Sequence, residues 1–224
     1  MRPAKPFKLL PPDVPAALLS ADALDECFFL RLAEQDDIEA TRFTGVRFEN
    51  LAARRAAFRG CVFEKCAFAQ DEELPIRYDF VDCVFANCDF AGMRFEKCEM
   101  RRCALARCRG VGATFTGAVL RSVTMDECQM AYSGFGMAKL TGVEMTACDF
   151  SHSSFGYAAL EQVKWDACKL TAAELFSVRL KDIDLRTNEL DGIVVGDRRE
   201  LEGAIVTPLQ ACELAKLLGV VVMD

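Results

Sequence analysis

The sequence predicts an all-β solenoid, a right-handed quadrilateral β-helix, and two observations lead to this fold class. The first is a period of five: of the 23 positions at five-residue spacing from residue 80 to residue 190, 22 carry a large apolar side chain, and only Gly110 departs. The second is a small or β-branched residue two positions before most of these, as Cys83 stands before Phe85. A period of five fits neither an α-helix, at about 3.6 residues per turn, nor a half-buried strand, whose side chains alternate.

These two columns predict how each wall of the solenoid is built. Each five-residue unit points one bulky and one small side chain inward and leaves three side chains outside. Four units, about 20 residues, close one square turn, and turns stack through strand-like backbone hydrogen bonds about 4.8 Å apart. Ten of the 12 cysteines lie in the small inward column, five of them at 20-residue steps from Cys88 to Cys168. We therefore expect buried free thiols rather than disulfides or a zinc site.

Several five-residue units resemble a known family. The segments CDFAG, CDFSH, CKLTA and AKLTG are similar to the signature of the pentapeptide-repeat family, in which a small and a polar residue precede Leu or Phe and two polar residues follow. The resemblance implies the same quadrilateral β-helix.

The chain divides into three parts. Residues 1–37 are expected to form an N-terminal extension and cap, in which prolines hold an extended entry and the segment ADALDECFFLRLAEQ covers the open first turn. Residues 38–206 form the solenoid. Residues 207–224 form a C-terminal helix followed by a strand-like tail.

The repeat has three irregular places. Phe68 and Phe80 are 12 residues apart, which is no multiple of five, and looping out about seven residues restores the frame. This loop, either a solvated insertion or a partner contact, consists of Asp71, Glu72, Glu73, Leu74, Pro75, Ile76 and Arg77. Gly110, at an inward position, predicts a gap in the core and a local bend. After Leu190 the pattern frays into a last irregular turn.

The C-terminal helix is expected from about Pro208 to Leu218. Thr207 and Gln210 form a capping box around Pro208, and Gly219 stands where a helix C-terminal glycine belongs. The apolar residues of the helix and tail exceed what one capping face needs, so the sequence favours a homodimer interface over a cap alone. The interface candidates are Leu209, Cys212, Leu214, Leu217, Leu218, Val220 and Val222.

The sequence contains no support for catalysis, a metal or another cofactor. The single histidine, His152, falls at an outward position, and no nucleophile, phosphate-binding or dinucleotide-binding motif is present. The formal charge of −7 opposes direct nucleic-acid binding. No run of about 20 apolar residues suggests a membrane span, and no secretory signal precedes the prolines. We expect a soluble cytoplasmic protein.

The function is then expected to reside in a surface. Residues 38–110 carry 13 basic and 11 acidic residues, a net +2, whereas residues 111–206 carry 9 and 14, a net −5. A rod of about eight turns is about 38 Å long, and a dimer joined at the C-terminal ends is about 75 Å long, which matches about 22 base pairs of duplex. The acidic residues expected to stand in for phosphates are Asp126, Glu127, Glu144, Asp149 and Asp166.

Two longer segments resemble one branch of this family in particular. CRGVGATFTGAVL and LEGAIVTPLQACELAKLLGVVV are similar to segments of the quinolone-resistance (Qnr-type) branch of pentapeptide-repeat proteins, in particular its chromosomal Gram-positive members. The resemblance implies a non-enzymatic homodimer that mimics B-form DNA and binds DNA gyrase and topoisomerase IV. Plasmid-borne members of that branch carry two loops, whereas this chain breaks register once, so protection from fluoroquinolones and simple inhibition both remain open. The alternative is a scaffold or adaptor that binds another protein through the same walls or the loop.

Overall fold

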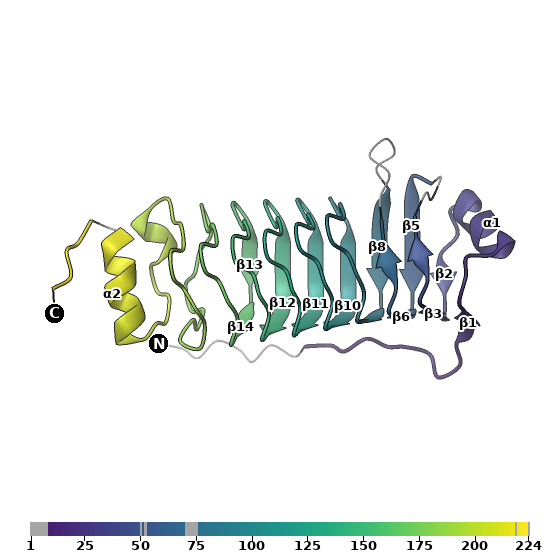
Figure 1. Cartoon of the computed structure of the whole chain (residues 1–224), viewed down its shortest axis with the longest axis horizontal. Helices are drawn as coiled ribbons and strands as arrows, with labels where there is room; N and C mark the ends of the chain where they lie inside the picture. Colours follow the sequence, from purple (N-terminus) through teal and green to yellow (C-terminus); the bar gives the residue numbers. More distant parts are fainter. Residues whose placement is uncertain (1–8, 50, 52, 70–75, 218, 224) are drawn as a thin grey trace.

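In the computed structural model, which describes residues 9–49, 51, 53–69, 76–217 and 219–223, parallel strands stack along one axis into a rod (Figure 1). A helix lies at each end of the rod. The elements are β1 (Leu19–Ala21), α1 (Glu26–Glu34), β2 (Ile38–Glu39), β3 (Thr41–Thr44), β4 (Arg47–Phe48), β5 (Arg55–Arg59), β6 (Val62–Glu64), β7 (Ala67–Phe68), β8 (Arg77–Val81), β9 (Val84–Ala86), β10 (Glu99–Ala106), β11 (Val119–Asp126), β12 (Lys139–Thr146), β13 (Ala159–Glu161), β14 (Lys164–Asp166), η1 (Arg198–Glu200) and α2 (Pro208–Leu217).

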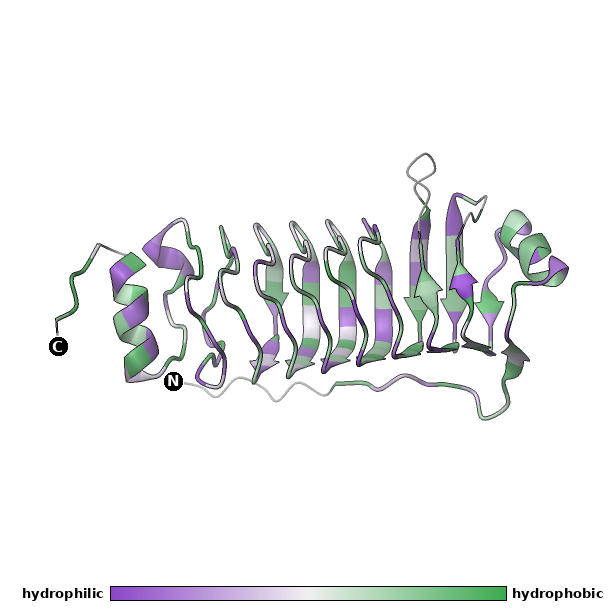
Figure 2. Cartoon of the chain, viewed as in Figure 1, coloured by the Kyte–Doolittle hydropathy of each residue, from purple (hydrophilic) through white to green (hydrophobic). Residues whose placement is uncertain are grey.

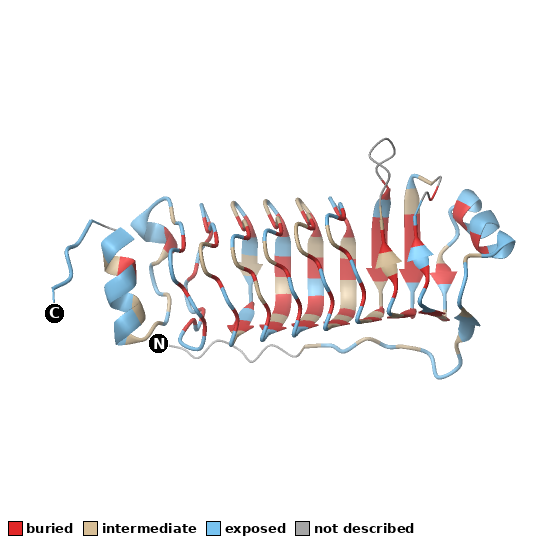
Figure 3. Ribbon diagram, viewed as in Figure 1, coloured by how far each residue is buried: buried red, intermediate tan, exposed pale blue. Residues whose placement is uncertain are grey.

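The predicted stacking is confirmed by the pairing register. Met100 of β10 pairs with Leu120 of β11, and Leu120 pairs with Leu140 of β12, so each of these turns advances the chain by 20 residues. Large inward side chains therefore lie on copies of themselves: the rings of Phe115 and Phe135 stack with centroids 4.9 Å apart and planes 6° from parallel. Figure 3 shows buried and exposed residues alternating along the strands. The core is a continuous column of these stacked side chains, and each fully buried one contributes about 1.5–3 kcal/mol to folding.

Tight corners make a five-residue wall possible. In the turn that starts in β10, the backbone takes a positive φ at four positions: Arg102 (49°), Arg107 (52°), Gly112 (69°) and Gly117 (67°). Each is two residues after an inward bulky position, and each turns the chain into the next wall. Four corners per turn give the square cross-section that the sequence predicts.

The cysteine column is a ladder of free thiols, as predicted. All ten inward cysteines are buried and unpaired, and only Cys27 and Cys212 are exposed. Every one of these thiols except that of Cys98 donates to a carbonyl of the preceding turn, as Cys148 Sγ does to Met125 O at 3.4 Å. Asn188 ends this ladder, because its Oδ1 accepts the Cys168 amide at 2.9 Å and its Nδ2 donates to Trp165 O at 3.0 Å. Asn188 thus ends the series of stacked cysteines that runs from Cys88 to Cys168 in steps of 20 residues.

The predicted loop at 71–77 is wrong at its C-terminal end. Ile76 is buried, and Arg77 is the first residue of β8, where it pairs with Arg55 of β5. Phe80 stacks over Phe58, 22 residues earlier, so the turn holds two residues more than its neighbours rather than seven. The shorter repair keeps Phe80 on the wall of Phe58, where the two rings stack. Residues 71–75 lie outside the described residues.

The predicted gap at Gly110 is also wrong. A Cβ added to Gly110 would lie 2.5 Å from Met130 Sδ and 2.9 Å from Met130 Cε, so the methionine of the next turn occupies the space. The wall continues through Gly110 with the same bridges as its neighbours, Asp89 to Arg109 and Arg109 to Gln129. Position 110 therefore has no room for a bulky residue, because the side chain of Met130 fills that part of the core.

The N-terminal part caps the rod and then lies along it. Asp25 caps α1 by accepting the Phe28 amide, and Phe28 and Leu32 are buried against the first turn, as the sequence predicts for a cap. Residues 9–17 follow one corner lengthwise (Figure 1). There the Asp13 amide donates to Asp82 Oδ1 at 3.0 Å, and a Cβ on Gly60 would lie 2.8 Å from Pro15 Cδ. An extended segment thus packs across successive turns where a corner residue lacks a side chain.

The C-terminal helix has the predicted ends. The Gln210 amide donates to Thr207 Oγ1 at 3.2 Å, and the Thr207 amide donates to Gln210 Oε1 at 2.8 Å, which is the capping box. Gly219, with φ +79°, ends the helix: its amide bonds Lys216 O and the Val220 amide bonds Ala215 O. Gln210 Nε2 also donates to Leu185 O and Asn188 O, so the same side chain docks α2 on the last turn.

Candidate functional surface

The five acidic candidates lie on two adjoining walls of the C-terminal half. Asp126 and Asp166 occupy one column of the strand wall, two turns apart, with Thr146 between them. Glu144 lies in a neighbouring column, Glu127 at the following corner and Asp149 on the next wall, bridged to Gln129 and Lys169. Two turns correspond to about 10 Å, so these carboxylates are spread along the rod rather than gathered at one point.

Cations moderate the charge of these walls. Asp166 accepts from Lys164 Nζ at 2.9 Å and from Thr187 Oγ1 at 3.0 Å, and these two hydrogen bonds, the lysine's being the stronger influence, lower the pKa of Asp166. Glu127 lies 3.9 Å from Arg107. Within the described residues, Asp126, Glu144 and Asp149 form no ion pair, and Asp149 accepts the Ser151 amide at 2.9 Å. Asp126 and Glu144 are therefore the candidate carboxylates most free to meet a cationic partner.

The residues predicted for the dimer interface differ in their surroundings: one packs on the solenoid as part of the cap, and others are exposed. Leu214 is buried against the solenoid, so it belongs to the cap and its assignment to a dimer surface is wrong. Leu209 is 75% exposed, and Cys212, Leu217, Val220 and Val222 are also exposed. Leu218 lies outside the described residues. Val220–Met223 are extended without strand pairing within the described part of the chain, and Figure 2 shows this tail as hydrophobic.

One side of the rod carries no charge over three turns. Residues 111–117, 131–137 and 151–157, here called the neutral face, contain no Asp, Glu, Lys or Arg. Thr114, Gly134 and Ser154 are bridged to one another, so the three stretches lie on one wall and its corners. Apart from His152, its exposed side chains are large and mostly apolar: Tyr132 is 63%, Met137 62% and Tyr157 68% exposed.

The single histidine belongs to the neutral face. His152 is exposed, as predicted, and its ring stacks on Tyr132 with centroids 4.9 Å apart. The sequence reasoning missed the neutral face because it followed only the inward positions. Writing the sequence in rows of 20 would have found it, because the uncharged stretches then lie above one another.

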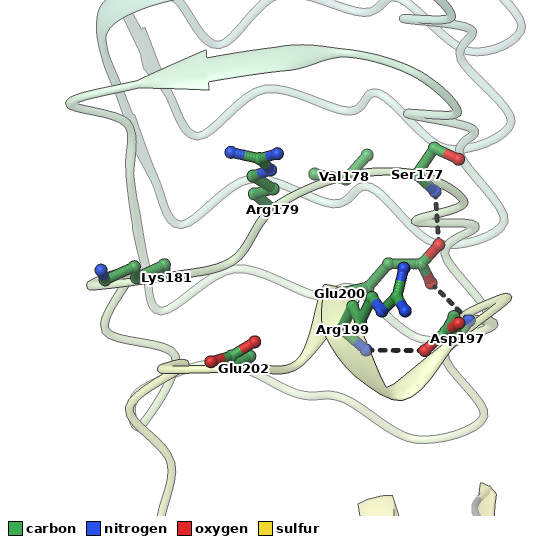
Figure 4. A pocket seen from close by; sticks show the side chains of 8 residues that line it. All are labelled: Ser177, Val178, Arg179, Lys181, Asp197, Arg199, Glu200 and Glu202. Atoms are coloured by element: carbon green, nitrogen blue, oxygen red, sulfur yellow. Dashed lines mark hydrogen bonds between the residues drawn. The ribbon is translucent and has the colours of Figure 1, made fainter.

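A cleft lies between the penultimate turn and η1. It has a volume of 580 Å³ and is lined by Arg179 and Lys181 on one side and by η1 and Glu202 on the other (Figure 4). Glu200 is buried there, but its carboxylate accepts the amides of Ser177, Gly196 and Asp197. This carboxylate therefore holds the last turn together.

Among residues whose position is described, no group of three or more His, Cys, Asp or Glu is placed to hold a metal ion. No helix in the described ranges is long and apolar enough to span a membrane.

Comparison with known proteins supports the repeat. The model of a pentapeptide repeat region matches residues 78–146. No curated protein matches the chain. Among solved structures, the chain is similar to a trypsin-treated variant of QnrB1, a plasmid-mediated fluoroquinolone resistance protein, with 19% identity, a TM-score of 0.39 and coverage of 92% of this chain and 98% of that one.

A second similar structure is HetL, a pentapeptide repeat protein involved in heterocyst differentiation regulation in the cyanobacterium Nostoc sp. strain PCC 7120. It shares 14% identity with a TM-score of 0.34, over 84% of this chain and 88% of that one. The chain is a β-solenoid, as the pairing of its strands at 20-residue steps shows, and its residues 78–146 match the model of a pentapeptide repeat region.

Proposed function

We propose that this chain is a non-enzymatic protein that mimics DNA and binds DNA gyrase or topoisomerase IV in the cytoplasm, where it modulates the enzyme and protects it from fluoroquinolones. The two segments that resemble the Qnr-type branch motivate the choice of partner. Its activity would then come from binding through the walls of the rod.

The observation that carries the proposal is the one-sided charge of the C-terminal half. The carboxylates of Asp126, Glu144 and Asp166 lie on strands β11, β12 and β14, whereas the neutral face has no ionised carboxylate to offer. A cationic groove built for duplex DNA would attract the acidic walls and leave the neutral face outward. The rod therefore has a defined orientation in such a groove.

The exposed apolar end supports a dimer. Leu209, Leu217 and Val220 are 75%, 44% and 52% exposed at the C-terminal end of the rod. Burial of these side chains against a second copy doubles the length of the rod and removes apolar surface from water. An end-to-end dimer then presents two acidic walls to the two halves of a two-fold symmetric enzyme.

The test is DNA supercoiling by purified gyrase with this protein titrated in, with and without ciprofloxacin, and DNA relaxation or decatenation by topoisomerase IV. The variant Asp126→Asn/Glu144→Gln removes two negative charges from the acidic walls. Its matched control, Ala131→Lys/Ser151→Lys, changes the net charge by the same amount on the neutral face. We expect the acidic-wall variant to inhibit about tenfold less strongly, and the control to inhibit like the parent protein.

Three results would count against the proposal. Equal loss in both variants would mean that net charge matters and the acidic walls do not. Full inhibition by the acidic-wall variant would refute this footprint. No effect of the parent protein on either enzyme would refute the partner and leave the scaffold or adaptor alternative.

A further inference from the structure

One wall of the C-terminal half carries the opposite charge from the others. Between corners at which φ is positive, the stacked turns place four stretches on one wall, here called the basic wall: residues 118–122, 138–142, 158–162 and 178–182. The basic wall holds four basic and two acidic residues, a net +2. The three other walls of the same four turns carry net charges of −1, −2 and −3. Positive charge is therefore concentrated on one side of an acidic rod.

The four cations of the basic wall are exposed and unpaired. They are Arg121, Lys139, Arg179 and Lys181. On the next wall, Lys164 and Arg186 each bind the aspartate two residues away. On the basic wall, Val119 and Thr141 occupy the corresponding positions beside Arg121 and Lys139. Within the described residues none of the four cations forms an ion pair, so their charges are available to a ligand.

The basic wall also places like charges side by side. Arg121 is the register partner of Arg101, so the two side chains start from strands about 4.8 Å apart. Arg101 pairs with Glu99, and Arg121 has no acid beside it. Arg179 and Lys181 lie two residues apart on the same wall. Repulsion between like charges opposes folding, so the stability of the solenoid does not explain these cations, whereas binding of an anion does.

The row of cations continues into the cleft beside η1. Arg179 and Lys181 line one side of this cleft and Arg199 lies on the other (Figure 4). Glu200 lies between them, but three backbone amides already bind its carboxylate. The remaining acids of the cleft are Asp197 and Glu202. From Arg121 to η1 the row extends over four turn-to-turn steps, about 19 Å.

The surface between the cations favours a nucleic acid over a protein as the anion. Its other outward residues are small or polar, such as Val119, Thr141 and Ala159, and none of the exposed large hydrophobic side chains of the described chain lies on the basic wall. Protein interfaces depend on aromatic and aliphatic anchors, whereas protein–DNA interfaces are polar and positively charged. Duplex DNA is rigid, and about 19 Å of it carries about 11 negative charges.

We infer that the basic wall binds the phosphate backbone of duplex DNA, with its four cations and Arg199 on phosphate oxygens. Phosphate contacts carry no sequence information, so the binding is independent of sequence. The net charge of −7 opposes it, which places the Kd near the weak end of non-specific binding, about 10⁻⁴ M at physiological salt. The inference goes beyond the proposed function and needs no topoisomerase. When a cationic groove holds the acidic walls, the basic wall faces outward beside the neutral face, open to DNA.

Fluorescence anisotropy of a labelled duplex of about 20 base pairs, measured between about 50 and 200 mM NaCl, tests the inference. For the parent protein we expect the logarithm of the association constant to fall with the logarithm of the salt concentration with a slope of about −4. The variant Arg121→Gln/Lys139→Gln should reduce the magnitude of the slope by about 2 and weaken binding at least about tenfold at the lowest salt.

A matched control separates the basic wall from net charge. Lys65→Gln/Lys169→Gln removes two exposed cations elsewhere on the rod, neither of which forms an ion pair in the described part of the chain. We expect this control to keep the slope and the Kd of the parent protein. Poly-glutamate is added as a competitor in a separate titration, and we expect the duplex to displace it at equal charge.

The outcomes separate this inference from the proposed function. No binding of the duplex by the parent protein at about 50 mM NaCl refutes the inference. Equal losses in the variant and its control attribute the binding to net charge and refute the basic wall. Poly-glutamate that displaces the duplex at equal charge refutes DNA as the ligand and indicates an acidic protein segment. These assays contain no enzyme, so a protein without effect on gyrase leaves the inference standing.

Discussion

Replacing Gly110 by alanine distinguishes a filled core from an empty one. If the glycine left a gap, an added methyl group would fill it and stabilise the protein. The structure places that methyl group 2.5 Å from Met130 Sδ, closer than van der Waals contact allows. Overpacking of this kind costs about 1–3 kcal/mol, and the cost falls toward the lower end because the end of a methionine side chain can move.

The measurements are urea unfolding and thermal unfolding, both followed by far-ultraviolet circular dichroism. For a chain of this length, a loss of about 1–2 kcal/mol lowers Tm by about 2–8 °C. The matched control is Gly134→Ala, whose added Cβ lies 3.6 Å from its nearest neighbour, Thr114 Cγ2. We expect the control to be neutral or more stable by about 0.4–1 kcal/mol, because alanine restricts the unfolded chain.

A double variant tests whether contact with Met130 causes the loss of stability in Gly110→Ala. Met130→Ala alone removes a buried side chain and costs about 2–5 kcal/mol. Once Met130 is shortened, the methyl group of Gly110→Ala has room, so the double variant should be no less stable than Met130→Ala alone. That result corresponds to a coupling of about 1 kcal/mol or more between the two positions. A Gly110→Ala protein that is as stable as the parent, or more stable, would refute the reasoning.

Two further variants test how the ends of the chain are held. Asp82 is buried and accepts from Arg102 and from the Asp13 amide; burial raises the pKa of Asp82, but these bonds outweigh it and lower the pKa below the ordinary value. The stabilisation is therefore present above about pH 4 and lost as pH falls through the lowered pKa. Asp82→Asn should cost about 1–3 kcal/mol at pH 7 in urea unfolding and less near pH 3; an equal cost at both would contradict this. Gln210→Ala removes the capping bond of α2 and two bonds to the last turn, so we expect about tenfold faster hydrogen exchange in α2, whereas Glu213→Ala, on the exposed side, should leave it unchanged.

The period of five in the sequence was enough to predict the solenoid, its inward columns and its thiol ladder. The reason is physical: a square turn repeats the same packing problem at every wall, so each wall needs the same pair of side chains. The capping box at Thr207 and the end of α2 at Gly219 were equally predictable, because caps depend on hydrogen bonds between residues close in the chain.

Contacts between turns decided the features that the period of five does not specify. Met130 fills the space above Gly110, and Phe80 selects the wall of Phe58, because stacked residues that are 20 or more positions apart compete for the same volume. The same holds at the surface. Leu214 faces the solenoid and Leu209 faces water because the docking of Gln210 sets how α2 is turned. The neutral face exists only when turns are stacked, since residues in three separate stretches become one surface when the chain has closed its corners.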